Sequence, residues 1–362
     1  MVFDDTRNKF YSDAIKALVT QDSVVMDLGA GLGLHGLIAA RAGAKKVYLV
    51  EPEPVILAAA KVAKENNLSE KIECFQTKIE GLELPQPVDV IISVFTGNFL
   101  LQEDLLPSLF HARDKHLSKK GRLIPDQAKM FVQPISSAKL FNEKIGRWAE
   151  LSQDFNFSVL QMHAANSMYT DNYRDTDYTS LASPAEILHM DFMTATCTDC
   201  KTSTTIELTD DGLCHGFFGW FDMRLGNHWL STSPTAEITH WRQVYLPLDP
   251  PVPVLKGQKL IFNLQRPEYG EWSWVIEING SRQKHSTFLS GPLQPSDLAK
   301  KADTYKPVLN KKGQLVREAL DLFEGNETAG NICQALSYRQ EPSFHSETEA
   351  RHFIAGLIAR YG

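Results

Sequence analysis

The stretch from Val24 to Glu51 constrains the fold of this 362-residue chain more than any other feature. It reads VVMDLGAGLGLHGLIAARAGAKKVYLVE: an apolar run, a glycine-rich loop at 29–33, a helical pattern at 34–42 and a second apolar run that ends on Glu51. A strand, a tight loop, a helix and a second strand in that order make a βαβ unit. The chain is therefore predicted to open with a parallel α/β sheet.

The glycines and the terminal acid of this unit predict a nucleoside cofactor. Gly29, Gly31 and Gly33 let the backbone run close under a ligand, and the amides that begin the following helix point into the same space. Glu51 follows about 20 residues later, where a carboxylate can accept hydrogen bonds from both hydroxyls of a ribose.

Two cofactor classes fit the pattern. Gly31, Gly33 and Gly36 satisfy G-x-G-x-x-G, so a nicotinamide or flavin dinucleotide is one candidate. Asp27 favours S-adenosylmethionine, because its carboxylate repels a pyrophosphate but attracts the ammonium of a methionine moiety and the neighbouring sulfonium. S-adenosylmethionine is the cofactor we predict, with a turn that needs glycine only for packing as the structural alternative.

The composition argues against nucleic-acid and membrane partners. The formal charge of −7 argues against a nucleic-acid surface, and no apolar run approaches the length of a membrane span. The N-terminal sequence MVFDDTRNKF does not read as a signal peptide, so we expect a cytoplasmic protein. The five cysteines are scattered and odd in number, which predicts neither a disulfide framework nor a metal site.

The pattern of the chain changes twice. Residues 1–125 alternate strands and helices, as a Rossmann-like α/β domain does. Residues 126–295 contain strand-like stretches between turn residues and predict an antiparallel β-barrel or sandwich. Within them, residues 141–178 are rich in Met, Phe and Tyr and predict an arm for self-association or a substrate lid. Residues 305–362 predict a small, mainly helical domain.

Other candidate site residues follow from their places in the first domain. The buried strand at 88–94 ends on Ser93 and Val94, at the carboxyl edge where an open α/β sheet binds its ligands. Arg7, on the first helix, either clamps the carboxylate of the cofactor or is a solvated helix charge. Glu80, in the loop after the third strand, is a candidate acceptor for an adenine amino group.

Over roughly residues 1–290 the sequence resembles the protein arginine methyltransferases. The stretches that carry the resemblance are DDTRNKFYSDAI, VVMDLGAGLG, AGAKKVYLVE, KIEGLELP, VDVIIS, LFHARDKHLSKKGRLIPD and STSPTAEITHWRQ. The last is the most specific, because Thr239, His240 and Trp241 match the Thr-His-Trp loop of that family.

The resemblance implies a methyltransferase domain followed by a β-barrel, with an arm that forms a head-to-tail homodimer. It implies that Arg7 binds the methionine carboxylate and that Asp27 and the glycine loop bind the methionine moiety. Glu51 and Glu80 would bind the ribose and the adenine amino group. It further implies that Asp4 pairs with His240, joining the two domains across the active site.

One departure from the family pattern concerns the acceptor. The family holds a guanidinium between two glutamates on the loop after the fourth strand, and here that loop reads SVFTGNFLLQE. Glu103 stands at the second glutamate position, but Val94 stands at the first, and Thr96 and Asn98 replace a Met and a Tyr. Two carboxylates localise the charge of the planar cation so that one nitrogen can attack. Loss of one puts arginine in doubt as the acceptor but leaves methyl transfer in place.

The sequence therefore predicts an enzyme that methylates a nitrogen of a peptide, a protein or a small molecule. Glu103 would orient the nucleophile, Asp4 and His240 would remove the proton, and Trp241 would line the substrate pocket with Val94, Thr96 and Asn98. A scaffold that binds the cofactor without catalysis is the alternative. Residues 306–362 resemble winged-helix modules related to peptide-binding chaperones, with a plain helical cap as the other interpretation.

Overall fold

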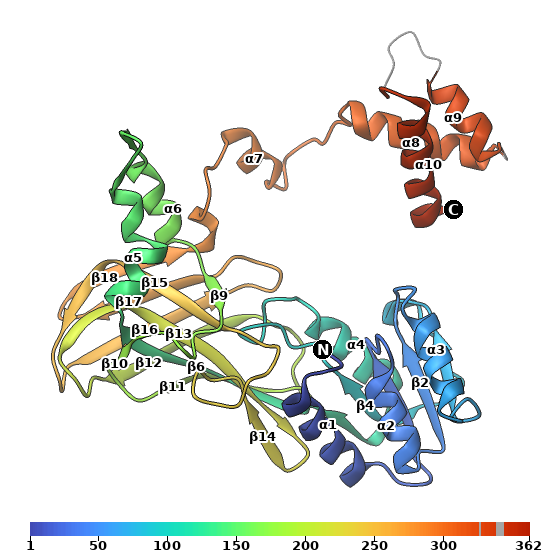
Figure 1. Cartoon of the computed structure of the whole chain (residues 1–362), viewed down its shortest axis with the longest axis horizontal. Helices are drawn as coiled ribbons and strands as arrows, with labels where there is room; N and C mark the ends of the chain where they lie inside the picture. The colour runs from blue at the N-terminus through green and yellow to red at the C-terminus, as the bar shows by residue number, and fades with distance from the viewer. Residues whose placement is uncertain (326, 338–343) are drawn as a thin grey trace. The chain divides into compact units, whose positions relative to one another are not determined.

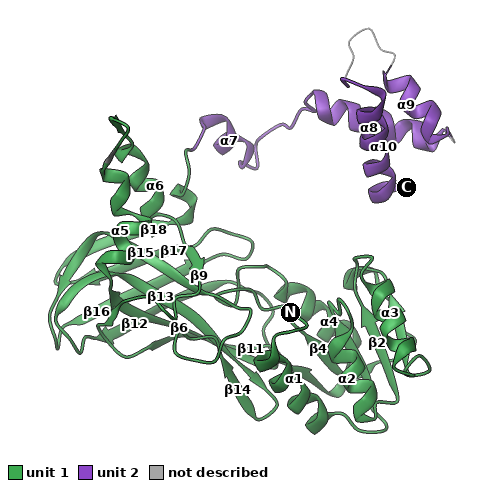
Figure 2. Ribbon diagram, in the orientation of Figure 1, with its two compact units in different colours: residues 1–292 green, residues 293–362 purple. Residues whose placement is uncertain are grey.

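The computed structural model describes residues 1–325, 327–337 and 344–362. The chain divides into two compact units, residues 1–292 and residues 293–362 (Figure 2). Each unit buries apolar side chains of its own, so each has a separate hydrophobic core.

The first part of unit 1 is a parallel sheet of five strands in the order β3-β2-β1-β4-β5 (Figure 1). The elements run α1 (Asp5–Leu18), β1 (Val24–Leu28), α2 (Leu34–Ala42), β2 (Lys46–Val50), α3 (Ile56–Glu65), β3 (Ile72–Phe75), the short helix η1 (Ile79–Gly81), β4 (Val88–Ser93), α4 (Leu106–His116) and β5 (Leu117–Ile124). This is the predicted Rossmann-like arrangement.

The order of the strands locates the ligand edge of this sheet. Strand β1 is buried along its whole length, and β2 and β4 pair with it on either side. The chain adds β2 and β3 on one side of β1 and then crosses to add β4 and β5 on the other. Ligands of open α/β sheets bind at such a switch point, beyond the carboxyl ends of the strands. Here that edge carries the glycine loop, Glu51 and Val94.

The second part of unit 1 consists of two antiparallel sheets that form the predicted barrel. The larger sheet contains β6 (Gln127–Ser136), β9 (Tyr169–Asp171), β10 (Thr179–Ser180), β11 (Ala185–Asp191), β13 (Gly212–Leu225), β14 (His228–Ser231) and β15 (Gln243–Val254). The smaller contains β12 (Cys200–Glu207), β16 (Lys259–Arg266), β17 (Ser273–Ile278) and β18 (Ser281–Ser286). Their inner faces meet at Phe217 and Phe262, whose ring centroids lie 4.7 Å apart.

Between β6 and β10 the chain leaves the barrel as an arm (Figure 1). The arm contains α5 (Ala138–Lys144), η2 (Gly146–Ala149), β7 (Leu151–Ser152), β8 (Phe155–Asn156), η3 (Ser158–Leu160) and α6 (Gln161–Ala165). It exposes a set of large apolar side chains that a buried connection would cover, namely Trp148, Phe155, Phe157, Val159 and Met162. Such a surface is typical of a contact with another molecule.

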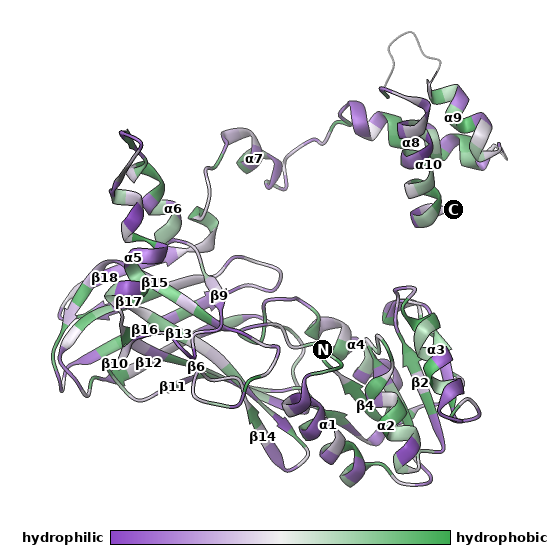
Figure 3. Cartoon of the chain, viewed as in Figure 1, coloured by the Kyte–Doolittle hydropathy of each residue, from purple (hydrophilic) through white to green (hydrophobic). Residues whose placement is uncertain are grey.

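Unit 2 is helical throughout its described residues. It comprises α7 (Pro295–Lys300), α8 (Lys311–Glu324), α9 (Ala329–Ser337) and α10 (Glu347–Tyr361), and both hydrophobic and hydrophilic residues occur on α8, α9 and α10 (Figure 3). The apolar sides of these three helices form a small core around Ala319, Leu336 and Ile354. The mainly helical prediction is confirmed. The winged-helix prediction is not, because a wing needs strands and the described part of this unit has none.

None of the helices in the described ranges combines the length and the apolar character needed to cross a membrane.

Candidate active site

The glycine loop between β1 and α2 adopts a backbone conformation that favours glycine. Gly29, Gly31 and Gly33 have φ angles of +69°, +53° and +78°. A Cβ on Gly29 would lie 2.3 Å from the ring of Phe95, whereas a Cβ on Gly31 would meet open space. Gly31 is therefore needed for its backbone angle, and Gly29 also for the close approach of the loop after β4.

Gly33 and one further glycine, Gly36, serve helix packing rather than ligand approach. A Cβ on Gly36 would lie 2.2 Å from a methyl of Leu49, and one on Gly33 would lie 2.9 Å from the other methyl of that leucine. These close approaches let α2 pack directly against β2. Gly33 and Gly36 are thus needed for packing against β2, and Gly29 for the close approach of Phe95.

A cavity of about 530 Å³ lies at the carboxyl edge of the sheet. Its walls come from the glycine loop, from the tips of β2 and β3, from the loop after β4, from α4 and from the barrel. The lining residues that matter for chemistry are Gly29, Glu51, Thr77, Glu80, Val94, Thr96, Glu103, Ser108 and His240. The fold therefore brings residues of both domains to one cavity.

Glu51 is fixed in this cavity by backbone amides. One carboxylate oxygen accepts from the N–H of Gly31 at 3.0 Å and the other from the N–H of Glu53 at 3.1 Å. The carboxylate at the tip of β2 is therefore held in one orientation before any ligand arrives.

Asp27 lies beneath the glycine loop rather than in the cavity wall. Its side chain is 2% exposed and accepts from the N–H of Gly36 at 2.7 Å. Burial raises the pKa of Asp27 to about 7, although the amide of Gly36 favours the charged form. A cation above the loop would restore that charge.

Arg7 projects from the first turns of α1 and is 2% exposed. Its Nη2 donates to the carbonyl oxygen of Met1 at 2.7 Å and to Asn8 at 2.8 Å. Its Nη1 is buried and has no hydrogen-bond partner in the part of the chain that the structure describes. A buried guanidinium N–H without an acceptor is costly, and a ligand carboxylate would satisfy it.

Glu80 and Ser93 lie differently with respect to the cavity. Glu80, on η1, lines it, and Ser108 on α4 donates to its carboxylate at 2.7 Å. Ser93 is buried at the end of β4, where its carbonyl oxygen accepts from the hydroxyl of Tyr11 at 2.8 Å. Ser108 was not predicted from the sequence; its place in the first turn of α4, facing the loop of Glu80, is visible only in the fold.

The loop after β4 presents Val94, Thr96 and Glu103 to the cavity. Burial raises the pKa of Glu103, whose carboxylate has no hydrogen-bond partner among the described residues. Gly97 allows the loop to close on itself, because a Cβ there would lie 2.7 Å from the backbone nitrogen of Glu103. The cavity thus has one carboxylate on this side and an apolar wall where Val94 stands.

The predicted contact between Asp4 and His240 is confirmed. Asp4 caps α1 by accepting from the N–H of Arg7, and its other oxygen lies 2.8 Å from both the backbone nitrogen and Nδ1 of His240. Burial lowers the pKa of His240 more than its bond to Asp4 raises it. The hydrogen bonds of Asp4 lower the pKa of that carboxyl, against the effect of its burial. A neutral imidazole held through Nδ1 offers Nε2 as a proton acceptor.

Trp241 and Asn98 brace the loop instead of lining the cavity. The indole N–H of Trp241 donates to the carbonyl oxygen of Thr96 at 2.6 Å. The next residue, Arg242, donates its backbone N–H to the side-chain oxygen of Asn98 at 2.7 Å. The barrel therefore holds the loop after β4 at the backbone of Thr96 and at the side chain of Asn98, and these two predicted pocket residues act at that contact.

Comparisons with known proteins agree with this architecture. Residues 25–121 match the model of a methyltransferase domain, and residues 126–269 match that of the arginine methyltransferase oligomerization subdomain. The second match falls on the barrel and its arm, which a methyltransferase sheet alone does not require.

The chain belongs to the protein arginine methyltransferase family.

Relatives in this family are similar over most of this chain. The histone-arginine methyltransferase CARMER of Drosophila yakuba is 32% identical over 274 residues, which cover 72% of this chain and 52% of that protein. The protein of the same name from Drosophila erecta is 33% identical over the same length. The chain spans about half the length of the curated relatives it matches.

Solved structures of the family share the fold. The enzyme-prozyme complex of Trypanosoma brucei PRMT1 with AdoHcy matches with a TM-score of 0.71 at 26% identity, covering 79% of this chain and 96% of that one. Arabidopsis thaliana protein arginine methyltransferase 10 matches with a TM-score of 0.68 at 25% identity, with the same coverage. Against the two-glutamate pattern of the family, the loop after β4 in this chain keeps Glu103 and replaces the other glutamate by Val94.

Proposed function

We propose that unit 1 transfers the methyl group of S-adenosylmethionine to a guanidinium nitrogen of arginine in a peptide or protein. The observation that carries this proposal is the single cavity shared by Glu51, Glu103 and His240, which groups a ribose acceptor, a cation acceptor and a proton acceptor. The names of the relatives support the choice of arginine over other nitrogens.

The residues present fit this cofactor. The carboxylate of Glu51 is held in one orientation and could accept hydrogen bonds from two ribose hydroxyls. Glu80 also lines the cavity and could accept one from an adenine amino group. The partnerless Nη1 of Arg7 matches a carboxylate, and the carboxyl of Asp27 matches a positive charge over the glycine loop. When bound, S-adenosylmethionine supplies an electrophilic methyl group on a positively charged sulfur.

The chain itself contributes alignment and charge. Glu103 draws the positive charge of the guanidinium toward the nitrogens it binds, so that the attacking nitrogen regains its lone pair. S-adenosylmethionine, held by the residues named above, would supply the methyl group to this nitrogen, and its sulfur would keep the electrons of the broken S–C bond. His240, oriented by Asp4, accepts the proton that the methylated nitrogen loses. Trp241 and Asn98 keep the loop of Glu103 in place during this step.

Transfer of a radiolabelled methyl group tests the proposal. We expect label from S-adenosylmethionine to reach arginine in a library of peptides, with lysine-substituted peptides and small amines as controls. Tight cofactor binding in calorimetry with no label on any acceptor would contradict the proposal and favour a scaffold. Label on amines alone would contradict the assignment of arginine.

Asp27 gives cofactor binding a pH dependence. In the free protein its pKa is near 7, so at pH 7 the carboxyl is about half protonated. A cationic ligand above the loop favours the ionised form, so binding should release protons, and the affinity should rise from pH 6 to pH 8. Calorimetry of cofactor binding at pH 7 in buffers of different ionisation enthalpy measures the release.

Asp27→Asn provides the matched control for that experiment. The amide keeps the shape of the side chain but cannot titrate, so the variant should bind at least tenfold more weakly at pH 8, with less proton release. Equal release by both forms would show that another group titrates on binding.

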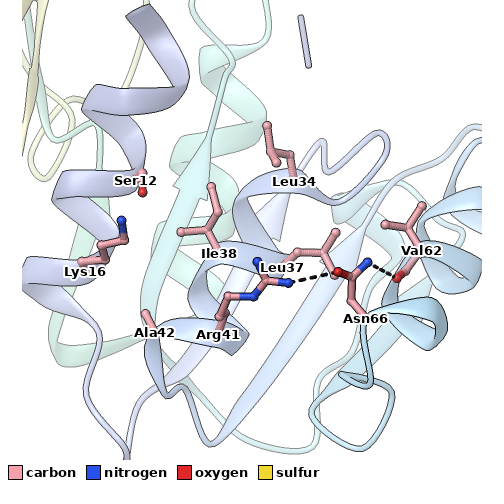
Figure 4. Close-up of a pocket in the computed structure, with 9 residues that line it drawn as sticks. All are labelled: Ser12, Lys16, Leu34, Leu37, Ile38, Arg41, Ala42, Val62 and Asn66. Atoms are coloured by element: carbon pink, nitrogen blue, oxygen red, sulfur yellow. Dashed lines mark hydrogen bonds between the residues drawn. The ribbon is translucent and has the colours of Figure 1, made fainter. Parts of the chain in front are cut away.

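We infer further that two copies of unit 1 assemble head to tail through the arm. A hollow of about 450 Å³ on the outer side of α1, α2 and α3 is floored by Leu34, Leu37, Ile38 and Val62 (Figure 4). Lys16 and Arg41 stand at its rim, and Arg41 donates to Asn66 at 3.0 Å. The exposed apolar side chains of the arm suit these apolar residues, and Glu150 of the arm is an acid that Lys16 or Arg41 could pair with.

A charge in the floor of the hollow should separate the two copies. We expect Leu37→Glu to convert a dimer in light scattering at micromolar concentration into a monomer, because a buried unpaired carboxylate opposes the contact. Leu57→Glu is the control. The side chain of Leu57 on α3 is 60% exposed, so this variant should remain dimeric. A dimeric Leu37→Glu protein, or a monomeric wild type, would contradict this assembly.

A further inference from the structure

We propose that Arg266 is a positioning residue for Glu103, acting through Asp104. The loop after β4 lines the acceptor side of the proposed site, and Glu103 near its end is the one carboxylate that the described residues place on that side. The inference rests on the proposed function for its effect on catalysis, but the effect of Arg266 on the mobility of the loop can be measured separately.

The loop does not hold its shape by local preference. Phe99, Leu100 and Asp104 have φ angles of +48°, +61° and +54°, in the left-handed region that residues other than glycine rarely adopt. Each such residue is intrinsically unfavourable in this conformation, so contacts outside the loop must stabilise it. Strain of this kind is typical of functional loops that a surrounding structure holds in place.

The barrel supplies such a contact next to Glu103. Arg266 ends β16, is 2% exposed, and forms an ion pair with the carboxylate of Asp104. Its guanidinium lies 5.3 Å from the ring of Trp272, and the centroid of that ring lies 5.3 Å from Phe99. One corner of the barrel therefore contacts the loop at two of its strained residues, immediately before and after the segment that ends on Glu103.

The charge of Arg266 makes this contact specific. Its Nε and Nη1 are buried without hydrogen-bond partners among the described residues, so Asp104 is the group that compensates the guanidinium. A buried cation with one anionic partner strongly favours the arrangement that keeps the pair together. The loop is thereby locked at position 104, one residue beyond the carboxylate that the acceptor needs.

This lock is distinct from the contacts of the Thr-His-Trp loop. The indole of Trp241 bonds the backbone carbonyl of Thr96, and the backbone N–H of Arg242 bonds the side chain of Asn98, both near the beginning of the loop. Arg266 acts at the other end, where Glu103 lies. Without it, the carboxylate would sample several orientations, and the acceptor would be aligned less often although the cofactor site is unchanged.

The test removes both charges together, because loss of one alone leaves the other buried and destabilises the fold. Asp104→Asn combined with Arg266→Met keeps the side-chain volumes, and Asn tolerates a positive φ. We expect this double variant to unfold within a few degrees of the wild type. Glu277→Gln combined with Arg282→Met, which removes an exposed ion pair between β17 and β18, is the control.

Two readouts decide the proposal. Amides of residues 99–104 should exchange with solvent at least tenfold faster in the double variant, and kcat/KM for the acceptor should fall at least tenfold while the Kd of the cofactor stays within twofold. Arg266→Lys with Asp104 unchanged retains the ion pair, so its amide exchange and its kcat/KM should lie between those of the double variant and those of the wild type. Unchanged exchange, or faster exchange with normal kcat/KM, would overturn the proposal. If the wild type transfers no methyl group, the proposed function fails and the exchange rates still test the link.

Discussion

Val94→Glu should raise kcat/KM for arginine peptides about a hundredfold. Val94 lines the same cavity as Glu103, at the position where the family pattern has the first of two glutamates. A second carboxylate would share the guanidinium and pair the nitrogens that now face an apolar wall. A charged hydrogen-bonded contact in a site of low dielectric contributes on the order of 3 kcal/mol, which corresponds to that factor in rate.

The same change should make the free protein less stable above neutral pH. Two carboxylates in one cavity repel each other, and burial already raises the pKa of Glu103. A bound guanidinium removes this repulsion, so the stability loss should disappear when acceptor peptide and cofactor product are added. Thermal unfolding at pH 6 and pH 8, with and without these ligands, measures the effect.

Val94→Gln is the matched control, because it has the length of glutamate without its charge. It should show less than a tenfold gain. Equal methylation of arginine peptides by the wild type and by Val94→Glu would show that position 94 does not face the acceptor cation.

The sequence predicted the α/β part of the fold well because its signals are local. The strand, loop and helix of residues 24–51 each have a periodicity and a boundary of their own, and β1, α2 and β2 appear at those places. The barrel was predicted less completely. The pattern predicts the class of this domain but does not mark every strand: β14 and β18 are short hairpin partners of β13 and β17, and β11 pairs with β6, far away in the chain.

The candidate site shows the same division. Asp4 and His240 are 236 positions apart, and only the family resemblance indicated that they meet. Asp27, Asn98 and Trp241 were expected at a ligand, yet the first lies beneath the glycine loop and the other two brace the loop after β4. Arg266 had no signal in the sequence, since a lone arginine at the end of a strand is usually a solvated charge.

Glu103→Gln should reduce kcat/KM for the acceptor at least a hundredfold while leaving the Kd of the cofactor unchanged. Glu103 is the carboxylate that the loop after β4 presents to the cavity, and Val94 offers no replacement. Glutamine keeps one oxygen acceptor but loses the charge, so the guanidinium would remain delocalised and its nitrogen a poor nucleophile. Initial rates at saturating cofactor, together with calorimetry of cofactor binding, separate the two effects.

The combination of both substitutions tests whether the two positions serve the same cation. If a carboxylate at position 94 and one at position 103 face a single guanidinium, Val94→Glu should restore much of the activity that Glu103→Gln removes, to within about tenfold of the wild type. With a hundredfold gain and a hundredfold loss expected from the single changes, this recovery is close to additive, so the interaction term of the double-mutant cycle should not exceed about a factor of ten in kcat/KM. No recovery would mean that the orientation held by Asp104 and Arg266, rather than the number of negative charges, makes Glu103 effective.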